Sequence, residues 1–294
     1  MCGNRLKAFT KHCGIDSRRL YDIIIFFMFK TNVRKPSSFK TIFQLAEFLV
    51  LILFLFWIMY KGTAELGYNW QWYRVPHFLF TLEDGFIPGP LLKGLWVTVK
   101  ITFFSLILTV FFGFIVALFR LSGSFTANML SRIYLETIRN TPLLIQLLFN
   151  YFVLSPILNI NSFWTAIITL ALFEGAYASE IIRAGIISID HGQWEAGRSI
   201  GLSKKQTYFF VIIPQAFRMI LPPLISQSVA LIKDSALVST IAIYDLTMQG
   251  QSIISETFLT FEIWFTIAGI YLVLALMITG IINLFKPANQ HSSI

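Results

Sequence analysis

Charged residues are scarce in this chain of 294 residues. Asp, Glu, Lys and Arg make up 13% of the sequence, whereas 56% is hydrophobic. A typical soluble domain has about 25% charged residues. Mean hydropathy is accordingly high, at +0.70. This composition excludes a soluble globular domain and predicts an all-α membrane protein.

Cysteine is almost absent, since the chain has only Cys2 and Cys13, both in a basic N-terminal stretch. Two cysteines at this spacing exclude a disulfide framework and the usual zinc spacings. His12 beside Cys13 is read as incidental, so no metal site is predicted. The basic leader before the first apolar run is too long for a cleavable signal peptide.

Several catalytic and nucleotide-binding motifs are missing from the sequence. It has no GxxxxGK[ST] phosphate loop, no HExxH pair and no GxSxG elbow. A chain without them is not expected to hold ATP in the manner of a phosphate-loop protein, to cleave peptides with zinc or to act as a serine hydrolase. No internal repeat is evident, which weakens an inverted-repeat secondary transporter.

Long apolar runs dominate what is present. About 20 apolar residues are needed to cross a bilayer, and the sequence predicts about six transmembrane helices. The predicted spans are 41–60, 95–119, 133–154, 163–182, a fifth from Gln215 interrupted by Pro222-Pro223, and 263–285. Within the third of these, Pro142 is expected to bend or start a helix. Residues 1–40 are a basic N-terminal segment. Residues 61–93 form an aromatic-rich loop, read as lying on the membrane surface rather than docking a soluble partner.

The distribution of Lys and Arg sets the orientation. With both termini in the cytoplasm, eighteen of these residues fall inside and four fall outside, with Lys100 in a span. Basic residues concentrate on the cytoplasmic side of membrane proteins. The net charge of +8 is therefore assigned to membrane orientation, and no nucleic-acid partner is expected.

The polar stretch from Asp190 to Pro214 lies between two apolar runs and predicts two short helices that meet at an elbow. Asp190 is a candidate N-cap, with Gln193 reaching back to it. Gly201 is a candidate left-handed C-terminal residue, and Ser203 with Gln206 forms a second capping pair. Pro214 is expected to end or break the second helix.

The order Glu195-Ala196-Gly197, Gly201 and Ile213-Pro214 resembles the EAA loop of ATP-binding-cassette (ABC) importer permeases. The continuation from Pro214 to Leu224 resembles the polar-amino-acid branch. The third position is Gly197 where the family usually has Ala, which lowers helix propensity by about 1 kcal/mol. The resemblance implies a type I permease fold over 91–285, in which the loop 190–214 couples to an ATPase. The coupling residues it implies are Gln193, Glu195, Ala196, Gly197, Gly201 and Leu202.

Further stretches are similar to the same family. These are Arg139-Asn140-Thr141-Pro142, the segment EGAYASEIIRAGI that contains Glu180, and Lys233-Asp234-Ser235-Ala236-Leu237, which is similar to the family's KDTSL segment. Lys233 and Asp234 are adjacent and can neutralise one another. Glu180 and Arg183 are expected to form a structural i,i+3 pair.

Candidate residues for a substrate pathway come from the apolar spans. Glu174 falls near the middle of the fourth span, where a charge costs about 2.5–3.5 kcal/mol, and Tyr177 follows one turn later. The alternative for Glu174 is a protonated side chain that hydrogen-bonds a neighbouring helix. A second group shares one helix face, where helix packing is the alternative role: Thr98, Thr102, Ser105, Thr109, Gly113 and Ala117. Lys233 and Asp234 complete the candidates.

The resemblance implies a multi-pass permease of the bacterial inner membrane that moves polar amino acids by alternating access. Its implied partners are ABC ATPase subunits, a second permease subunit and an external amino-acid-binding protein, all assembled around the lipid bilayer. No cofactor is expected on this chain, because ATP and Mg are used by the partner ATPase. An ATP-independent secondary transporter or channel, and a membrane scaffold, are the alternatives.

Overall fold

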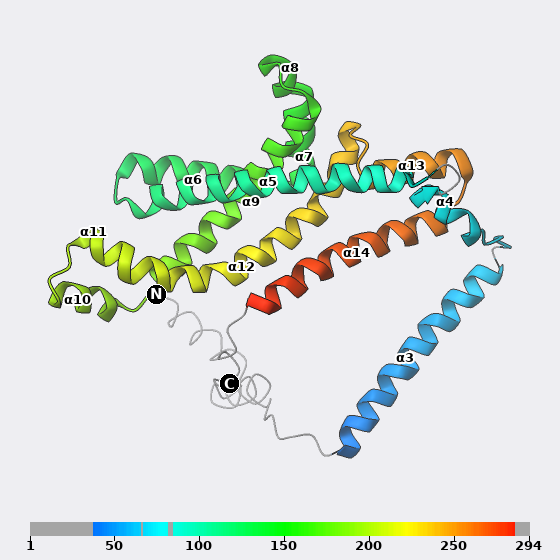
Figure 1. Cartoon of the computed structure of the whole chain (residues 1–294), viewed down its shortest axis with the longest axis horizontal. Coiled ribbons are helices and arrows are strands. Elements are labelled where there is room, and N and C mark those ends of the chain that lie inside the picture. Colours follow the sequence, from blue (N-terminus) through cyan, green and yellow to red (C-terminus); the bar gives the residue numbers. More distant parts are fainter. Residues whose placement is uncertain (1–37, 66, 82–84, 286–294) are drawn as a thin grey trace, which may run out of the picture. The chain divides into compact units, whose positions relative to one another are not determined.

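The computed structural model describes residues 38–65, 67–81 and 85–285 (Figure 1). It divides into two compact units, 1–69 and 70–294. Each unit is considered by itself.

The first unit contains one long helix, α3 (Ser38–Glu65). Its 28 residues span about 42 Å at 1.5 Å per residue, and the predicted first span 41–60 lies within it. Phe54 stacks on Trp57 at 6.1 Å, and the Lys61 ammonium lies 5.1 Å from the Trp57 ring. The prediction for the basic segment 1–40 falls almost wholly outside the described residues.

The second unit is helical apart from a two-residue antiparallel ladder that pairs Phe80 with Pro88 and Thr81 with Ile87. Its elements in chain order are η1 (Trp72–Arg74), α4 (Val75–Leu79), β1 (Phe80–Thr81), β2 (Ile87–Pro88), α5 (Pro90–Leu121), α6 (Phe125–Arg139), α7 (Leu143–Phe149), η2 (Asn150–Leu154), α8 (Ser155–Leu158), α9 (Ser162–Ile187), α10 (His191–Ser199), α11 (Lys204–Thr207), η3 (Tyr208–Ile212), α12 (Ile213–Asp234), η4 (Ser235–Ile241), α13 (Leu246–Thr257) and α14 (Thr260–Phe285).

Four helices of the described chain are long and apolar enough to cross a membrane: α5, α9, the continuous helix Lys204–Ile241, and the part of α14 up to Gly280. The bent pair of α6 with α7–α8 is a candidate for a fifth. The predicted spans 95–119, 163–182 and 263–285 lie within α5, α9 and α14. The all-α membrane class is confirmed, whereas six spans and cytoplasmic termini remain predictions.

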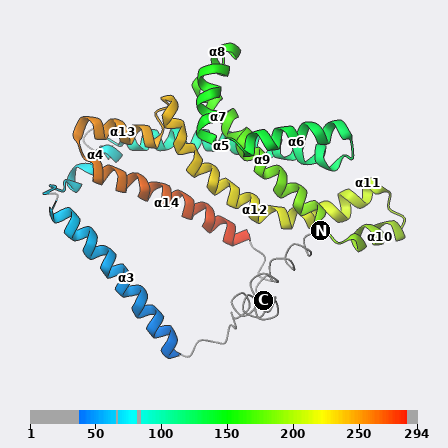
Figure 2. The same cartoon turned by 180° about the vertical axis from the view of Figure 1, so that it is seen from behind.

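The third predicted span, 133–154, consists of two helices, and the predicted bend or helix start at Pro142 is confirmed. Helix α6 ends at Arg139, and α7 starts at Leu143 after a bend of 102°. Pro142 lies just before α7, where its missing N–H costs no helical hydrogen bond. Figure 2 shows α6 running beside α5, while α7 and α8 project away from it. The proline thus starts a new helix.

The helix predicted to end at Pro214 instead continues from α11 through η3 into α12. Proline lacks an N–H and its ring crowds the carbonyl four residues earlier. The π-helical turn Tyr208–Ile212 lies at that point and widens the helix. Pro222 and Pro223 also lie inside α12 without ending it, so the predicted interruption of this span is not observed.

Helix α9 is the centre of the second unit. In the most apolar stretch of α9, 67% of the residues are buried, compared with 28% in α5 and a smaller share in the other two spans. Small residues allow this close packing: a Cβ on Gly113 of α5 would come within 2.8 Å of the Ala178 Cβ on α9. Ile101 of α5 and Ile167 and Leu170 of α9 belong to one core cluster with further apolar side chains.

The two ends of the second unit differ. Helices α10 and α11 lie at one end, and α4 and α13 lie at the other (Figures 1 and 2). The predicted loop 61–93 contains the end of α3, two short helical turns and the β1–β2 ladder. The buried carboxylate of Glu262 on α14 accepts a hydrogen bond of 2.7 Å from the Gln71 backbone N–H, which fastens this segment to the spans.

Candidate functional site

The elbow between α9 and α12 is built by local capping. Asp190 accepts a hydrogen bond from the Gly192 N–H at 2.7 Å and so caps α10. Gly201 adopts a left-handed conformation with φ of +82°. Ser203 and Gln206 form a reciprocal capping box at the start of α11. These three predictions are confirmed, and they fix the turn between the two helices.

Gln193 does not reach back to Asp190 as predicted. Its side-chain oxygen instead accepts a hydrogen bond of 3.0 Å from the Gln215 amide on α12. On the same side of the elbow, the Trp194 ring lies 5.8 Å from the ring of Tyr208 in η3. These contacts join α10 to the membrane span that follows it.

Gly197 makes the third contact between α10 and the following span. A Cβ at this position would lie 2.5 Å from Cγ2 of Thr207 and 2.8 Å from its Oγ1. Such distances are shorter than real Cβ contacts, so the backbones can approach this closely only with glycine. The close contact with Thr207 therefore explains why position 197 holds glycine where the family usually has alanine.

The remaining coupling residues lie at the surface. The Glu195 side chain is 69% exposed, and one of its oxygens lies 3.2 Å from Nδ1 of His191. Ala196 is exposed and Leu202 is half-buried, with the Leu202 N–H donating to the Gly197 carbonyl at 3.1 Å. The elbow therefore exposes polar side chains of both charge signs, among them Glu195, Arg198, Lys204 and Lys205.

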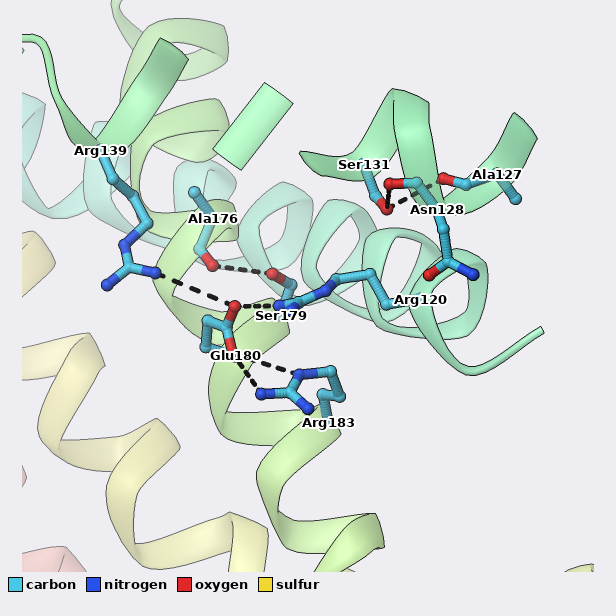
Figure 3. Close-up of polar contacts among 9 residues, drawn as sticks. All are labelled: Arg120, Ala127, Asn128, Ser131, Arg139, Ala176, Ser179, Glu180 and Arg183. Carbon is cyan, nitrogen blue, oxygen red and sulfur yellow. Dashed lines mark hydrogen bonds and ion pairs between the residues drawn. The ribbon is translucent and has the colours of Figure 1, made fainter. Parts of the chain in front are cut away.

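A second polar centre gathers around Glu180 near the same end (Figure 3). One oxygen of Glu180 contacts Nη1 of Arg120 on α5, and the other lies 3.0 Å from Nη2 of Arg183. Arg139 at the end of α6 is 3.9 Å away and lies over the Tyr177 ring at 5.4 Å. The predicted Glu180–Arg183 pair is confirmed, and the carboxylate also joins α9 to α5 and α6.

Nothing in the sequence indicated that Arg120 and Arg139 would meet Glu180, because neither arginine lies within one helical turn of it in the chain. Together with Glu136 and others they line a polar cavity of about 310 Å³, with residues Arg120, Arg132, Leu135, Glu136, Arg139, Asn140, Tyr177 and Glu180. Opposite charges at close range offset part of the cost of burying them.

Glu174 is almost fully buried, with 1% of the residue exposed. Gln227 of α12 donates a hydrogen bond to its carboxyl group, and Asp234 lies close enough to interact with it. Among the ion pairs of the described residues, none joins Asp234 to Lys233, which is exposed. The structure thus brings Glu174 and Asp234 together and leaves Lys233 and Tyr177 apart from them.

The hydroxyl stripe of α5 faces neighbouring helices. Ser105 donates to the Ile167 carbonyl of α9 at 3.3 Å, and Thr98 accepts from the Leu246 N–H at 3.1 Å. In the described residues, the buried hydroxyls of Thr102 and Thr109 have no hydrogen-bond partner. The stripe therefore packs in this conformation, and its part in a pathway remains a prediction.

Asp245 was not among the predicted site residues. It is fully buried, caps α13 through a bond of 2.9 Å from the Met248 N–H, and lies 3.4 Å from the Tyr271 hydroxyl. Burial raises the pKa of Asp245 to about 6. Asp245 stands directly before α13 and accepts from the N–H three residues later. An acid at the start of a helix is a capping pattern that can be read from the sequence.

No three His, Cys, Asp or Glu side chains gather closely enough to hold a metal ion within 38–65, 67–81 and 85–285.

Replacing Gly197 with Ala is expected to loosen the elbow. Overpacking against Thr207 costs about 1–3 kcal/mol, which exceeds the roughly 1 kcal/mol that Ala gains in helix propensity. Trypsin should therefore cleave after Arg198 and Lys204 faster than in the unmodified chain. The double variant Gly197→Ala/Thr207→Ala should return to slow cleavage, with Thr207→Ala as the control. Unchanged cleavage of Gly197→Ala would show that the close approach is not a constraint.

Replacing Glu180 with Gln is expected to lower the apparent melting temperature of the purified chain. The change leaves Arg120 and Arg183 without their half-buried counter-charge, at a cost of about 1–3 kcal/mol. Arg139→Gln is the matched control, because a longer and more exposed pair contributes about 0–1 kcal/mol. Equal losses for the two variants would contradict this assignment of partners.

Comparison with known proteins supports one family. The model for the binding-protein-dependent transport system inner membrane component matches residues 109–290. The glutamine transport system permease protein GlnP of Escherichia coli (strain K12) is 37% identical over 196 residues, covering 66% of this chain and 90% of the relative. The L-cystine transport system permease protein TcyB of Bacillus subtilis (strain 168) is 43% identical over 167 residues, covering 56% and 71% respectively.

Solved structures agree with the sequence relatives. An amino acid ABC transporter crystallised with histidines is 40% identical, with a TM-score of 0.64 over 67% of this chain and 92% of that chain. The MetNI methionine ABC transporter in an inward facing conformation is 19% identical and shares the fold, with a TM-score of 0.57 over 67% and 94%. The chain therefore belongs to the family of binding-protein-dependent transport system inner membrane components.

Proposed function

We propose that this chain is the permease subunit of an ABC importer that carries a polar amino acid across the inner membrane of a bacterium. The observation that supports this most directly is an exposed helical elbow held rigidly at one end of the apolar spans. Membership of the permease family supports a coupling role for this elbow. Relatives named for glutamine and cystine support amino acids as the substrate class.

The elbow is suited to transmit force. Gln193, Gly197 and Trp194 contact Gln215, Thr207 and Tyr208, respectively. At its other end α10 begins only a few residues after α9. A push on α10 would therefore move α9 and α12 instead of being absorbed by a flexible loop. Coupling also requires the elbow to make different contacts in two states of the importer.

The force would come from partner ATPase subunits. The sequence has no phosphate loop, so ATP and Mg would be bound and used by those partners. The exposed surface around Glu195 would dock into the ATPase, a second permease subunit would complete the translocation pathway, and an external binding protein would deliver the amino acid. Alternating access then follows from ATP-driven movement of the two elbows.

The substrate would pass close to Glu174. This carboxyl group lies near the middle of α9 with Gln227 and Asp234 around it. An ionisable group within a membrane span is expensive and is usually retained for function. Two acids and an amide could recognise an ammonium group, which every amino acid carries.

Glu195→Lys is expected to abolish coupling without disturbing the fold. Because the side chain is exposed, the spans should still form, whereas a reversed charge at a docking surface weakens binding at least about tenfold. The test is ATP-dependent uptake of labelled polar amino acids into proteoliposomes with the candidate ATPase inside and the binding protein outside. Co-purification of the ATPase provides a second measure.

Thr126→Lys is the matched control, since it adds a cation at the exposed start of α6 near the same end of the unit. This variant should take up substrate normally. Unchanged uptake and unchanged ATPase co-purification in Glu195→Lys would refute the coupling role. Uptake without any ATPase would instead favour the secondary-transporter alternative.

Glu174→Gln should lower uptake of the amino acids that the importer carries. The substitution keeps a hydrogen-bonding group opposite Gln227 and removes the carboxyl group proposed to bind the substrate ammonium, so uptake should fall about tenfold. ATPase binding should be unchanged, because Glu174 is remote from the elbow. Glu256→Gln, an exposed acid of α13, is the control. Normal uptake of every substrate by Glu174→Gln would show that Glu174 is not part of the substrate pathway.

A further inference from the structure

A groove of about 1150 Å³ lies beside the elbow, and we call it the elbow groove. It is lined by the ends of α5 and α9, by the start of α10, and by α11 and η3. The lining residues that carry the argument are Leu118, Leu121, Ile187, Phe209, Lys204 and Lys205. Its volume is at the upper end of that of ligand pockets, so it has room for a long ligand.

The walls of the elbow groove are apolar and open to the outside. Ile187 is 57% exposed and Phe209 is 64% exposed. Ile186 and Ile189 are buried beside them, and they pack in the same cluster as Leu121. Contiguous exposed apolar surface of this kind marks an interaction site or a membrane contact.

The position of the groove at the ends of two candidate membrane spans places it at the edge of the bilayer. Leu121 is the last residue of α5 and Ile187 is the last residue of α9, and both helices are candidate membrane spans. Their last turns lie where a span leaves the hydrocarbon layer. The apolar walls are therefore placed at the boundary between acyl chains and headgroups, where a lipid can enter from the side.

The charge at the rim is positive, and no acid among the described residues forms an ion pair with it. Lys204 and Lys205 are exposed, and neither takes part in an ion pair within the described residues. The nearest acid of the groove lining, Asp190, is used to cap α10. Two free ammonium groups beside an apolar groove at the membrane surface match a phosphate headgroup above an acyl chain.

We infer that the elbow groove binds an anionic phospholipid of the cytoplasmic leaflet. One acyl chain lies against Ile187 and Phe209, and the phosphate group pairs with Lys204 and Lys205. A soluble protein would have to enter the bilayer plane to reach these walls. The inference depends on the chain spanning a membrane and is independent of which amino acid it carries.

The test counts lipids retained by the full-length chain. The protein is reconstituted in vesicles of phosphatidylcholine and phosphatidylglycerol, extracted in mild detergent, and analysed by mass spectrometry of the intact protein. The unmodified chain should retain phosphatidylglycerol in preference to phosphatidylcholine. Lys204→Gln/Lys205→Gln should retain about tenfold less of it, because each lysine near the surface contributes to anionic-lipid affinity.

Two further variants distinguish lipid binding in the elbow groove from a general effect of net charge. Arg198→Gln/Arg218→Gln makes the same change in net charge at exposed positions outside the groove lining and should retain phosphatidylglycerol normally. Ile187→Trp fills the groove and should lower retention while leaving the lysines in place. Helical circular dichroism identifies any variant that has not folded.

Three results would overturn the inference. Full phosphatidylglycerol retention by Lys204→Gln/Lys205→Gln would contradict the proposed contact between these lysines and the headgroup. Equal loss in the arginine control would show only a diffuse attraction to positive charge. A cross-link from Phe209→Cys to the ATPase in the assembled complex would show that a protein occupies the groove.

Discussion

The close approach of α5 to α9 is the contact on which the rest of the second unit depends. It exists because small side chains face one another: a Cβ on Gly113 would lie 2.8 Å from the Ala178 Cβ, and one on Gly175 would lie 3.2 Å from the Phe112 Cβ. In lipid there is little hydrophobic drive for helices to associate, so packing of small residues supplies the association. With α5 fixed against it, α9 becomes the most buried span, and the neighbouring helices pack around this pair.

The ends of α5 and α9 next to the elbow carry the candidate functional features. Glu180 joins α9 to Arg120 of α5 and Arg139 of α6, and the elbow follows directly after α9. Because the elbow is bonded to α12 as well, movement at its exposed surface is transmitted to two spans at once. The same ends form the walls of the elbow groove, so an anionic lipid in this groove would contact the spans and the elbow together.

Local features of the site could be predicted because they depend on neighbours in the chain. Capping by Asp190 and Ser203 and the left-handed turn at Gly201 each involve residues at most three apart. Two predictions about the elbow were wrong, those for Gln193 and Pro214. Gln193 was given a local partner, but Gln215 lies 22 residues away, and Pro214 was expected to break a helix that a π-helical turn allows to continue.

The sequence by itself determined that this is an all-α membrane protein of the permease family, because span length, scarcity of charge and the order of the motifs are all properties of the linear chain. Only the tertiary structure decided the partners of Glu174 and Glu180 and the contact between Gly197 and Thr207. Each of these depends on which helix faces which across distant parts of the chain. Helix-to-helix contacts are set by packing in three dimensions, and neither apolar periodicity nor capping chemistry encodes them.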